Sequence, residues 1–226
     1  CFLLGLAAAT RIHPPPHPPV AGRRHLRAEI GEALRFIWRH DVLRALFVLL
    51  SVGGGLMGGS AFTLLPRIAR DEFGRDAAEA ARLFALVGVG MVTTSLLLMR
   101  YRSRIRRRGL VFMCFMVIGT TDQVLPGLAP SFLALEALLL CWGLTGGMYM
   151  NLNQALIQEL TPRDRMGRVM ALNSMVSAGL LPLGGLAAAV LASAIGAQQS
   201  LSMFGVLGLG CVLVAIWRAN GLRSLP

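Results

Sequence analysis

Six apolar stretches dominate this sequence, and each is long enough to cross a lipid bilayer as a helix. They are residues 42–65, 80–99, 110–128, 132–156, 169–195 and 200–217. A membrane helix needs about 20 apolar residues, because the hydrocarbon core is about 30 Å thick. None of the stretches shows the regular alternation of apolar and polar residues that a membrane β-barrel requires. The sequence therefore predicts an all-α membrane protein with six crossings.

The basic residues between these stretches predict the orientation of the chain. All 22 are arginines, and they gather in the segments 11–44, 100–108, 163–168 and 218–223. Segment 66–82 contains four arginines and four acids, and segments 122–131 and 192–201 contain no arginine. Basic residues collect on the cytoplasmic side of membrane helices. We therefore expect a multi-pass protein of the inner or plasma membrane, with a cytoplasmic C-terminus and basic loops facing the headgroups of the lipid bilayer.

The composition argues against several other classes of protein. A net charge of +11 would suggest a nucleic-acid partner in a soluble protein, but no basic domain is set apart here, so we expect none. Without lysine there is no phosphate-binding loop, and the usual hydrolase motifs are missing, so we expect no catalytic residue and no enzyme. The four cysteines have no Cys or His at metal-ligand spacing, so we expect no metal site and no cofactor.

The order of segments predicts four parts along the chain. They are the end of a truncated transmembrane helix at 1–10, a cytoplasmic linker with an amphipathic helix at 11–41, a six-helix transmembrane bundle at 42–219, and a cytoplasmic tail at 220–226. The first part leads us to expect a fragment whose N-terminal portion is missing. Within the linker, Leu26, Ile30, Leu34 and Ile37 recur at helical spacing, as in helices that lie on a membrane surface.

One predicted crossing, 132–156 with its extension, carries a stripe of polar and small residues. At about 100° per residue the stripe falls within roughly 80° of arc, and its members are Glu136, Gly143, Gly147, Asn151, Gln154 and Gln158. Such a stripe either lines a water-filled substrate cavity or packs against another helix. For the cavity, the candidates are Gly147, Asn151 and Gln154.

Two acids lie well within the apolar stretches, and burying charge in a membrane is costly. Asp122 and Glu136 are therefore candidates for ion coupling. The alternative is an acid solvated among the outer headgroups, and this interpretation is favoured for Glu136.

Glycines cluster in the first crossing, with five between residues 53 and 59. Gly54, Gly55 and Gly58 are hinge candidates beside a substrate path, and Pro182 gives the fifth crossing a similar kink signal. The alternative is close helix packing through small residues four apart.

Two segments resemble a known family. Residues 32–40 (EALRFIWRH), and residues 153–162 (NQALIQELTP) followed by 164–172 (DRMGRVMAL), resemble the major facilitator superfamily, in the branch of the enterobactin exporter and macrolide-efflux proteins. The resemblance implies that the six helices form the C-terminal half of such a transporter, with residues 1–10 as the tail of its sixth helix. It also implies alternating access, a small-molecule substrate and a missing N-terminal six-helix half as partner.

By the same resemblance, Asp164, Arg165, Gly167 and Arg168 would form a cytoplasmic latch that pairs in one conformation and separates in the other. The alternative is simple helix capping and membrane orientation. The loop at 103–108 lacks the Asp and the internal Gly that this superfamily often carries after its eighth helix.

These observations together predict a secondary active transporter, specifically an ion-coupled exporter of amphipathic small molecules such as drugs or siderophores. One alternative is the membrane subunit of an ATP-driven exporter, although the basic loops at 100–108 and 163–168 look too short to dock an ATPase. The other is a non-transporting membrane anchor or sensor, in which the polar stripe would only pack helices.

Overall fold

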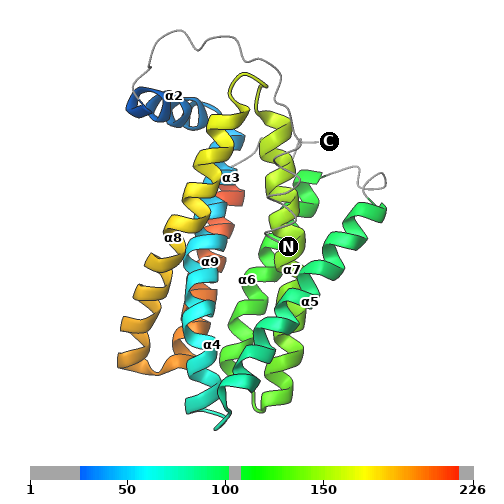
Figure 1. Cartoon of the computed structure of the whole chain (residues 1–226), viewed down its shortest axis with the longest axis vertical. Helices are drawn as coiled ribbons and strands as arrows, with labels where there is room; N and C mark the ends of the chain where they lie inside the picture. The colour runs from blue at the N-terminus through cyan, green and yellow to red at the C-terminus, as the bar shows by residue number, and fades with distance from the viewer. Residues whose placement is uncertain (1–25, 102–107, 219–226) are drawn as a thin grey trace, which may run out of the picture.

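The computed structural model describes residues 26–101 and 108–218, and this part of the chain is helical throughout, without strands (Figure 1). Six helical segments in it are long and apolar enough to cross a membrane: Asp41–Asp71, Ala77–Tyr101, Arg108–Leu128, Phe132–Leu160, Met166–Ile195 and Ala197–Arg218. Each contains one predicted stretch, so the prediction of an all-α bundle with six crossings is confirmed. The predicted helix end at 1–10, the proline-rich part of the linker and the tail at 220–226 lie outside the described residues.

The first crossing is built from three consecutive helical pieces. The elements in chain order are α2 (Leu26–Arg39), α3 (Asp41–Leu50), the π-helix η1 (Ser51–Gly58), α4 (Gly59–Asp71), α5 (Ala77–Tyr101), α6 (Arg108–Val124), the 3-10 helix η3 (Leu125–Leu128), α7 (Phe132–Leu160), α8 (Met166–Ile195) and α9 (Ala197–Arg218). Thus α3, η1 and α4 together form the first crossing, and η1 coincides with the glycine cluster.

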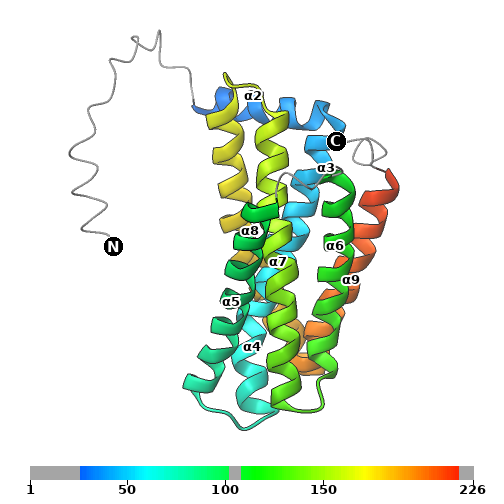
Figure 2. The same cartoon turned by 90° about the vertical axis from the view of Figure 1, so that its right-hand side faces the viewer.

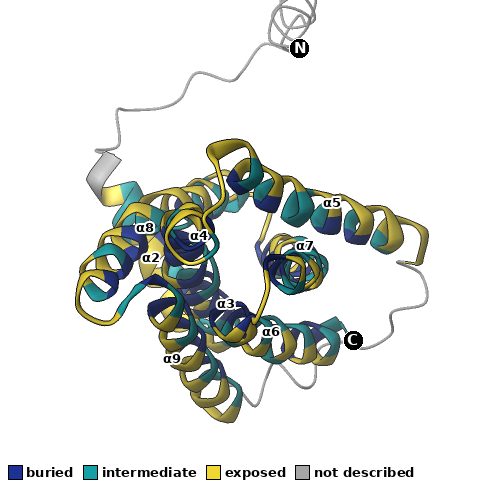
Figure 3. Ribbon diagram, turned by 90° about the horizontal axis from the view of Figure 1, so that it is seen from below, coloured by how far each residue is buried: buried dark blue, intermediate teal, exposed yellow. Residues whose placement is uncertain are grey.

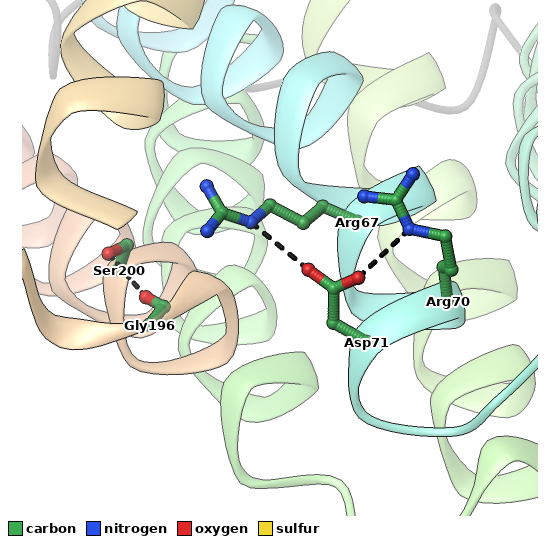
Figure 4. A network of polar contacts seen from close by, with 5 residues as sticks. All are labelled: Arg67, Arg70, Asp71, Gly196 and Ser200. Carbon is green, nitrogen blue, oxygen red and sulfur yellow. Dashed lines mark hydrogen bonds and ion pairs between the residues drawn. The ribbon is translucent and has the colours of Figure 1, made fainter. Parts of the chain in front are cut away.

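Local capping signals mark where α7 begins and where α8 ends, at the end of the bundle opposite α2. The hydroxyl of Ser131 accepts a hydrogen bond from the Ala134 amide at 3.3 Å and caps α7. Gly196, at φ +88°, takes the left-handed region between α8 and α9, and its carbonyl accepts from the Ser200 hydroxyl at 2.6 Å (Figure 4). These caps allow the antiparallel helices to follow one another through tight turns.

Helix α2 lies across one end of the bundle, roughly perpendicular to the crossings (Figures 1 and 2). Its residues Ala33 and Ile37 are buried in a core cluster shared with α3, α6, α7 and α8. On its other side Leu34 and Trp38 are exposed, Trp38 by 59%. The face of α2 with Ala33 and Ile37 therefore packs on the bundle, whereas Leu34 and Trp38 remain exposed.

The crossings bury their small and polar residues and expose many large apolar ones. Within the bundle α7 lies between α5 and α6, while α4 packs against α8 (Figure 3). Val92, Leu133 and Leu186 each expose more than half of their surface. Outward-facing apolar side chains of this size are expected where a helix meets lipid.

The arginines at the end opposite α2 are paired with acids. Asp71 bridges Arg67 at 3.2 Å and Arg70 at 2.9 Å (Figure 4). The other two arginines of this end pair likewise, Arg75 with Glu79 at 3.0 Å and Arg82 with Glu136 at 2.6 Å. Locally balanced charge at this end agrees with the acid-matched segment 66–82 of the sequence.

Candidate functional site

A cavity of about 620 Å³ lies between α5 and α7 on one side and η1, α4 and α8 on the other, with α6 at its back. This volume is in the range of sites for drug-sized ligands. Its aromatic side chains are Phe62, Phe84, Phe115, Trp142 and Tyr149. Five methionines add flexible apolar surface, and none of the described lining residues is charged. The arrangement can hold a bulky, mainly apolar molecule.

The glycines of η1 serve both the cavity and helix packing. Gly54 lines the cavity, and a Cβ there would meet nothing within 4 Å. Gly55 instead faces α8, where a Cβ would lie 2.6 Å from the Cβ of Leu180. Gly58 lines the cavity and touches its neighbours only loosely, with the Gly53 carbonyl oxygen 3.6 Å from its would-be Cβ. Of the two interpretations of the cluster, packing therefore applies to Gly55, and Gly54 borders the open space.

The crossing of η1 and α4 with α8 is a contact between backbones. A Cβ at Gly184 would lie 2.1 Å from the carbonyl oxygen of Gly55, and one at Gly59 would lie 2.2 Å from that of Leu181. Pro182 sits within this same part of α8, which continues through it as one helix. Small residues on both helices are therefore needed at this crossing.

A buried glutamine holds the junction of η1 and α4, and the sequence analysis did not single it out. The Gln123 side chain on α6 donates to the Met57 carbonyl at 3.2 Å and to the Ser60 hydroxyl at 3.0 Å. Gln123 is 2% exposed and its Oε1 accepts no hydrogen bond among the described residues. Its position directly after Asp122, inside an apolar stretch, is the signal that could have identified it.

The predicted polar stripe on α7 divides between two surroundings. Gly143 and Gly147 pack against α5, where a Cβ would lie 2.3 Å from the Val87 carbonyl oxygen and 2.8 Å from the Met91 Cα, respectively. The Asn151 side chain donates to the Ser95 hydroxyl of α5 at 2.9 Å. Among the cavity candidates, Gln154 lines the cavity, whereas Gly147 and Asn151 lie at the contact with α5. The stripe thus combines both interpretations that the sequence left open.

The two acids proposed for ion coupling lie in different settings. Asp122 is partly buried on α6, with its Oδ2 3.2 Å from the hydroxyl of Thr145, which lines the cavity. Glu136 lies nearer the end opposite α2, where its side chain is 14% exposed and pairs with Arg82. Only Asp122 is therefore one side chain away from the cavity.

Two of the four predicted latch residues, Arg165 and Arg168, contact α2. Arg168 donates to Glu32 at 3.1 Å and lies 3.9 Å from Glu29. The Arg165 guanidinium lies 4.8 Å from the centre of the Phe36 ring.

Asp164 is exposed and lies 3.6 Å from Arg165, and a Cβ at Gly167 would meet nothing within 4 Å. Sequence reasoning placed the pairing within 164–168 and missed the acids of α2. Their spacing of three residues on one helical face was the available signal.

Comparison with known families agrees with this architecture. The family model described as Major Facilitator Superfamily matches residues 1–182, most of the 226 residues. The chain belongs to the major facilitator superfamily. Proteins of this family are secondary transporters. No significant match to a curated protein or to a solved structure was found.

Proposed function

We propose that this chain forms the C-terminal six-helix half of an ion-coupled exporter of amphipathic small molecules, such as drugs or siderophores. The cavity bordered by η1, α4, α5, α7 and α8 is the main observation that supports the proposal. It lies in a member of the major facilitator superfamily. In an alternating-access transporter a cavity between two halves opens to each side in turn. The N-terminal half would supply the opposite wall.

The proposed orientation places α2 on the cytoplasmic side of an inner or plasma membrane, with the C-terminus on that side too. Arg35 and Arg39 of α2 are exposed there and have no ion pair within the described part of the chain. The arginines at the other end are matched by acids. The number of arginines rather than the net charge marks the cytoplasmic side. The arginine-rich turn at 163–168 lies at the α2 end too, which supports this orientation.

Asp122 is the proposed site of ion coupling. Thr145 joins it to the cavity, so a proton arriving at Asp122 would remove the charge that the Thr145 hydroxyl faces at 3.2 Å. The Thr145 hydroxyl would then keep only its contacts with carbonyls of its own helix, such as that of Trp142 at 3.0 Å. Glu136 is the second candidate, since its protonation would release Arg82.

The contact between α2 and the start of α8 is the proposed latch. Arg168 with Glu32, and Arg165 over Phe36, join a surface helix to the helix that carries one wall of the cavity. Rocking of α8 would have to break both contacts. The glycines Gly54, Gly55 and Gly58, with Pro182, are the proposed places where the first and fifth crossings bend.

An efflux assay tests the proposal. Cells that express the full-length protein should accumulate less of an amphipathic dye than cells without it, and an uncoupler should abolish the difference. Asp122→Asn should remove this efflux, whereas Glu72→Gln, an exposed acid at the end of α4, should preserve it. Efflux that survives the uncoupler and requires ATP would favour the ATP-driven alternative, and equal accumulation in all cells would overturn the proposal.

A further inference from the structure

The cavity carries information about the charge of its ligand. Its described lining residues include no acid and no base, and its surface is largely apolar. A charged group that left water or the lipid headgroups for this wall would lose its solvation without gaining an opposite charge. The lining of this wall therefore offers no ion pair to a cation or to an anion, and Asp122 lies behind Thr145.

Two amides give the cavity a polar end. Gln154 on α7 and Asn173 on α8 both line it. At 1.5 Å per residue they lie about 10 Å and about 12 Å along their helices from the turn at 161–165. Neither side-chain amide makes a hydrogen bond within the described part of the chain, and the Oδ1 of Asn173 is buried without a partner. A buried amide oxygen without a partner is costly, so a ligand that donates to the Asn173 Oδ1 removes that cost. Gln154 is exposed, and its unpaired amide can donate to or accept from the same group of the ligand.

From these two observations we infer that the cavity binds an uncharged aromatic molecule whose single polar group, one that can donate and accept hydrogen bonds, lies against Gln154 and Asn173. This inference rests on the proposed function, because it names the class of molecule that the same site would carry. The inference distinguishes between the two classes of substrate in the proposed function, drugs and siderophores. A neutral aromatic drug fits this wall, whereas a charged siderophore does not.

The apolar body alone cannot select the ligand. A molecule dissolved in lipid is already among apolar groups, so transfer into the cavity gains little from the hydrophobic effect. The ring stacking offered by Trp142 and Phe115 adds a modest term. The hydrogen bonds to the two amides must therefore supply most of the discrimination between ligands of the same shape.

A matched series of pyrenes tests the inference on the full chain in phosphatidylcholine nanodiscs. The probes are 1-pyrenemethanol, 1-methylpyrene, 1-pyrenemethylammonium and 1-pyrenecarboxylate, which share one ring system and differ in the polar group. Equilibrium dialysis against empty nanodiscs measures the probe bound to protein. Energy transfer from Trp142 to pyrene, with Trp38 and Trp217 replaced by Phe, reports whether the bound probe is in the cavity.

We expect saturable binding of 1-pyrenemethanol, about tenfold tighter than that of 1-methylpyrene, as two ordinary hydrogen bonds would give. Both charged probes should bind more weakly than the alcohol. Asn173→Leu and Gln154→Leu should each reduce the advantage of the alcohol over 1-methylpyrene. Asn153→Leu is the matched control for Asn173→Leu, because the Oδ1 of Asn153 is likewise buried without a partner but Asn153 does not line the cavity.

Two results would overturn the inference: a charged probe that binds as tightly as the alcohol, or an advantage of the alcohol that persists in Asn173→Leu and Gln154→Leu. The chain could bind 1-pyrenemethanol as expected while the full-length protein shows no efflux. That result would support the inference and contradict the proposed transport function. The two failures are thus distinguishable.

Discussion

Replacing Gly184 with alanine should loosen the contact on which the cavity wall depends. The new Cβ would lie 2.1 Å from the carbonyl oxygen of Gly55 and 3.1 Å from the Cα of Leu56, all of it backbone. An ordinary contact is about 3.4 Å or longer, so α8 and η1 must separate by about 1.3 Å. Overpacking of this kind costs about 1–3 kcal/mol, and a gap of 0.5–1 Å already forfeits about a quarter to a half of each dispersion contact.

The matched control is Gly179→Ala in the same helix, where a Cβ would meet nothing within 4 Å. Alanine raises helix stability over glycine by about 1 kcal/mol at either site, so the difference between the two variants isolates the packing cost. Unfolding in mixed micelles with rising SDS should show Gly184→Ala less stable than Gly179→Ala by about 1–3 kcal/mol. Equal stabilities would refute the claim that this crossing is a backbone contact.

Three further changes test other contacts by the same unfolding assay. Gln123→Leu removes the hydrogen bonds to Met57 and Ser60 and should lower stability by about 1–3 kcal/mol; an unchanged value would mean that Gln123 does not hold η1. Tyr149→Phe removes the hydroxyl that donates to the Leu49 carbonyl and should cost about 0.5–1.5 kcal/mol, whereas a gain in stability would contradict that bond. A double-mutant cycle on Glu32 and Arg168 should give a coupling of about 0.2–1 kcal/mol that shrinks in high salt, and a coupling of zero at low salt would remove the ion pair from the latch.

The crossings themselves could be predicted because the membrane imposes a simple rule. Every backbone polar group must be satisfied within the helix, so a long apolar run has one available structure. Local signals such as Ser131 before α7 and Gly196 after α8 then mark where helices begin and end. The π-helical form of η1 could not be predicted from the sequence. Glycine permits several backbone conformations, and the packing of neighbouring helices determines which one is adopted.

The candidate site was harder to predict, because periodicity defines a face of a helix but not the neighbour that covers it. The stripe on α7 was identified, yet only the fold shows that Asn151 meets Ser95 while Gln154 meets the cavity. The acidic partner of Arg168 lies 136 residues away, a separation over which sequence spacing carries no information. Asn173 was overlooked, although an amide inside an apolar stretch is the same kind of signal as that of Gln123.

The proposed transport function requires this cavity to open alternately to the two sides of the membrane. Ser177, which lines it, can be replaced by cysteine in a full-length protein whose native cysteines have been removed. A membrane-impermeant maleimide should label this cysteine from either side, and a proton gradient should raise the rate from one side while lowering it from the other. Labelling confined to one side under every condition would contradict alternating access.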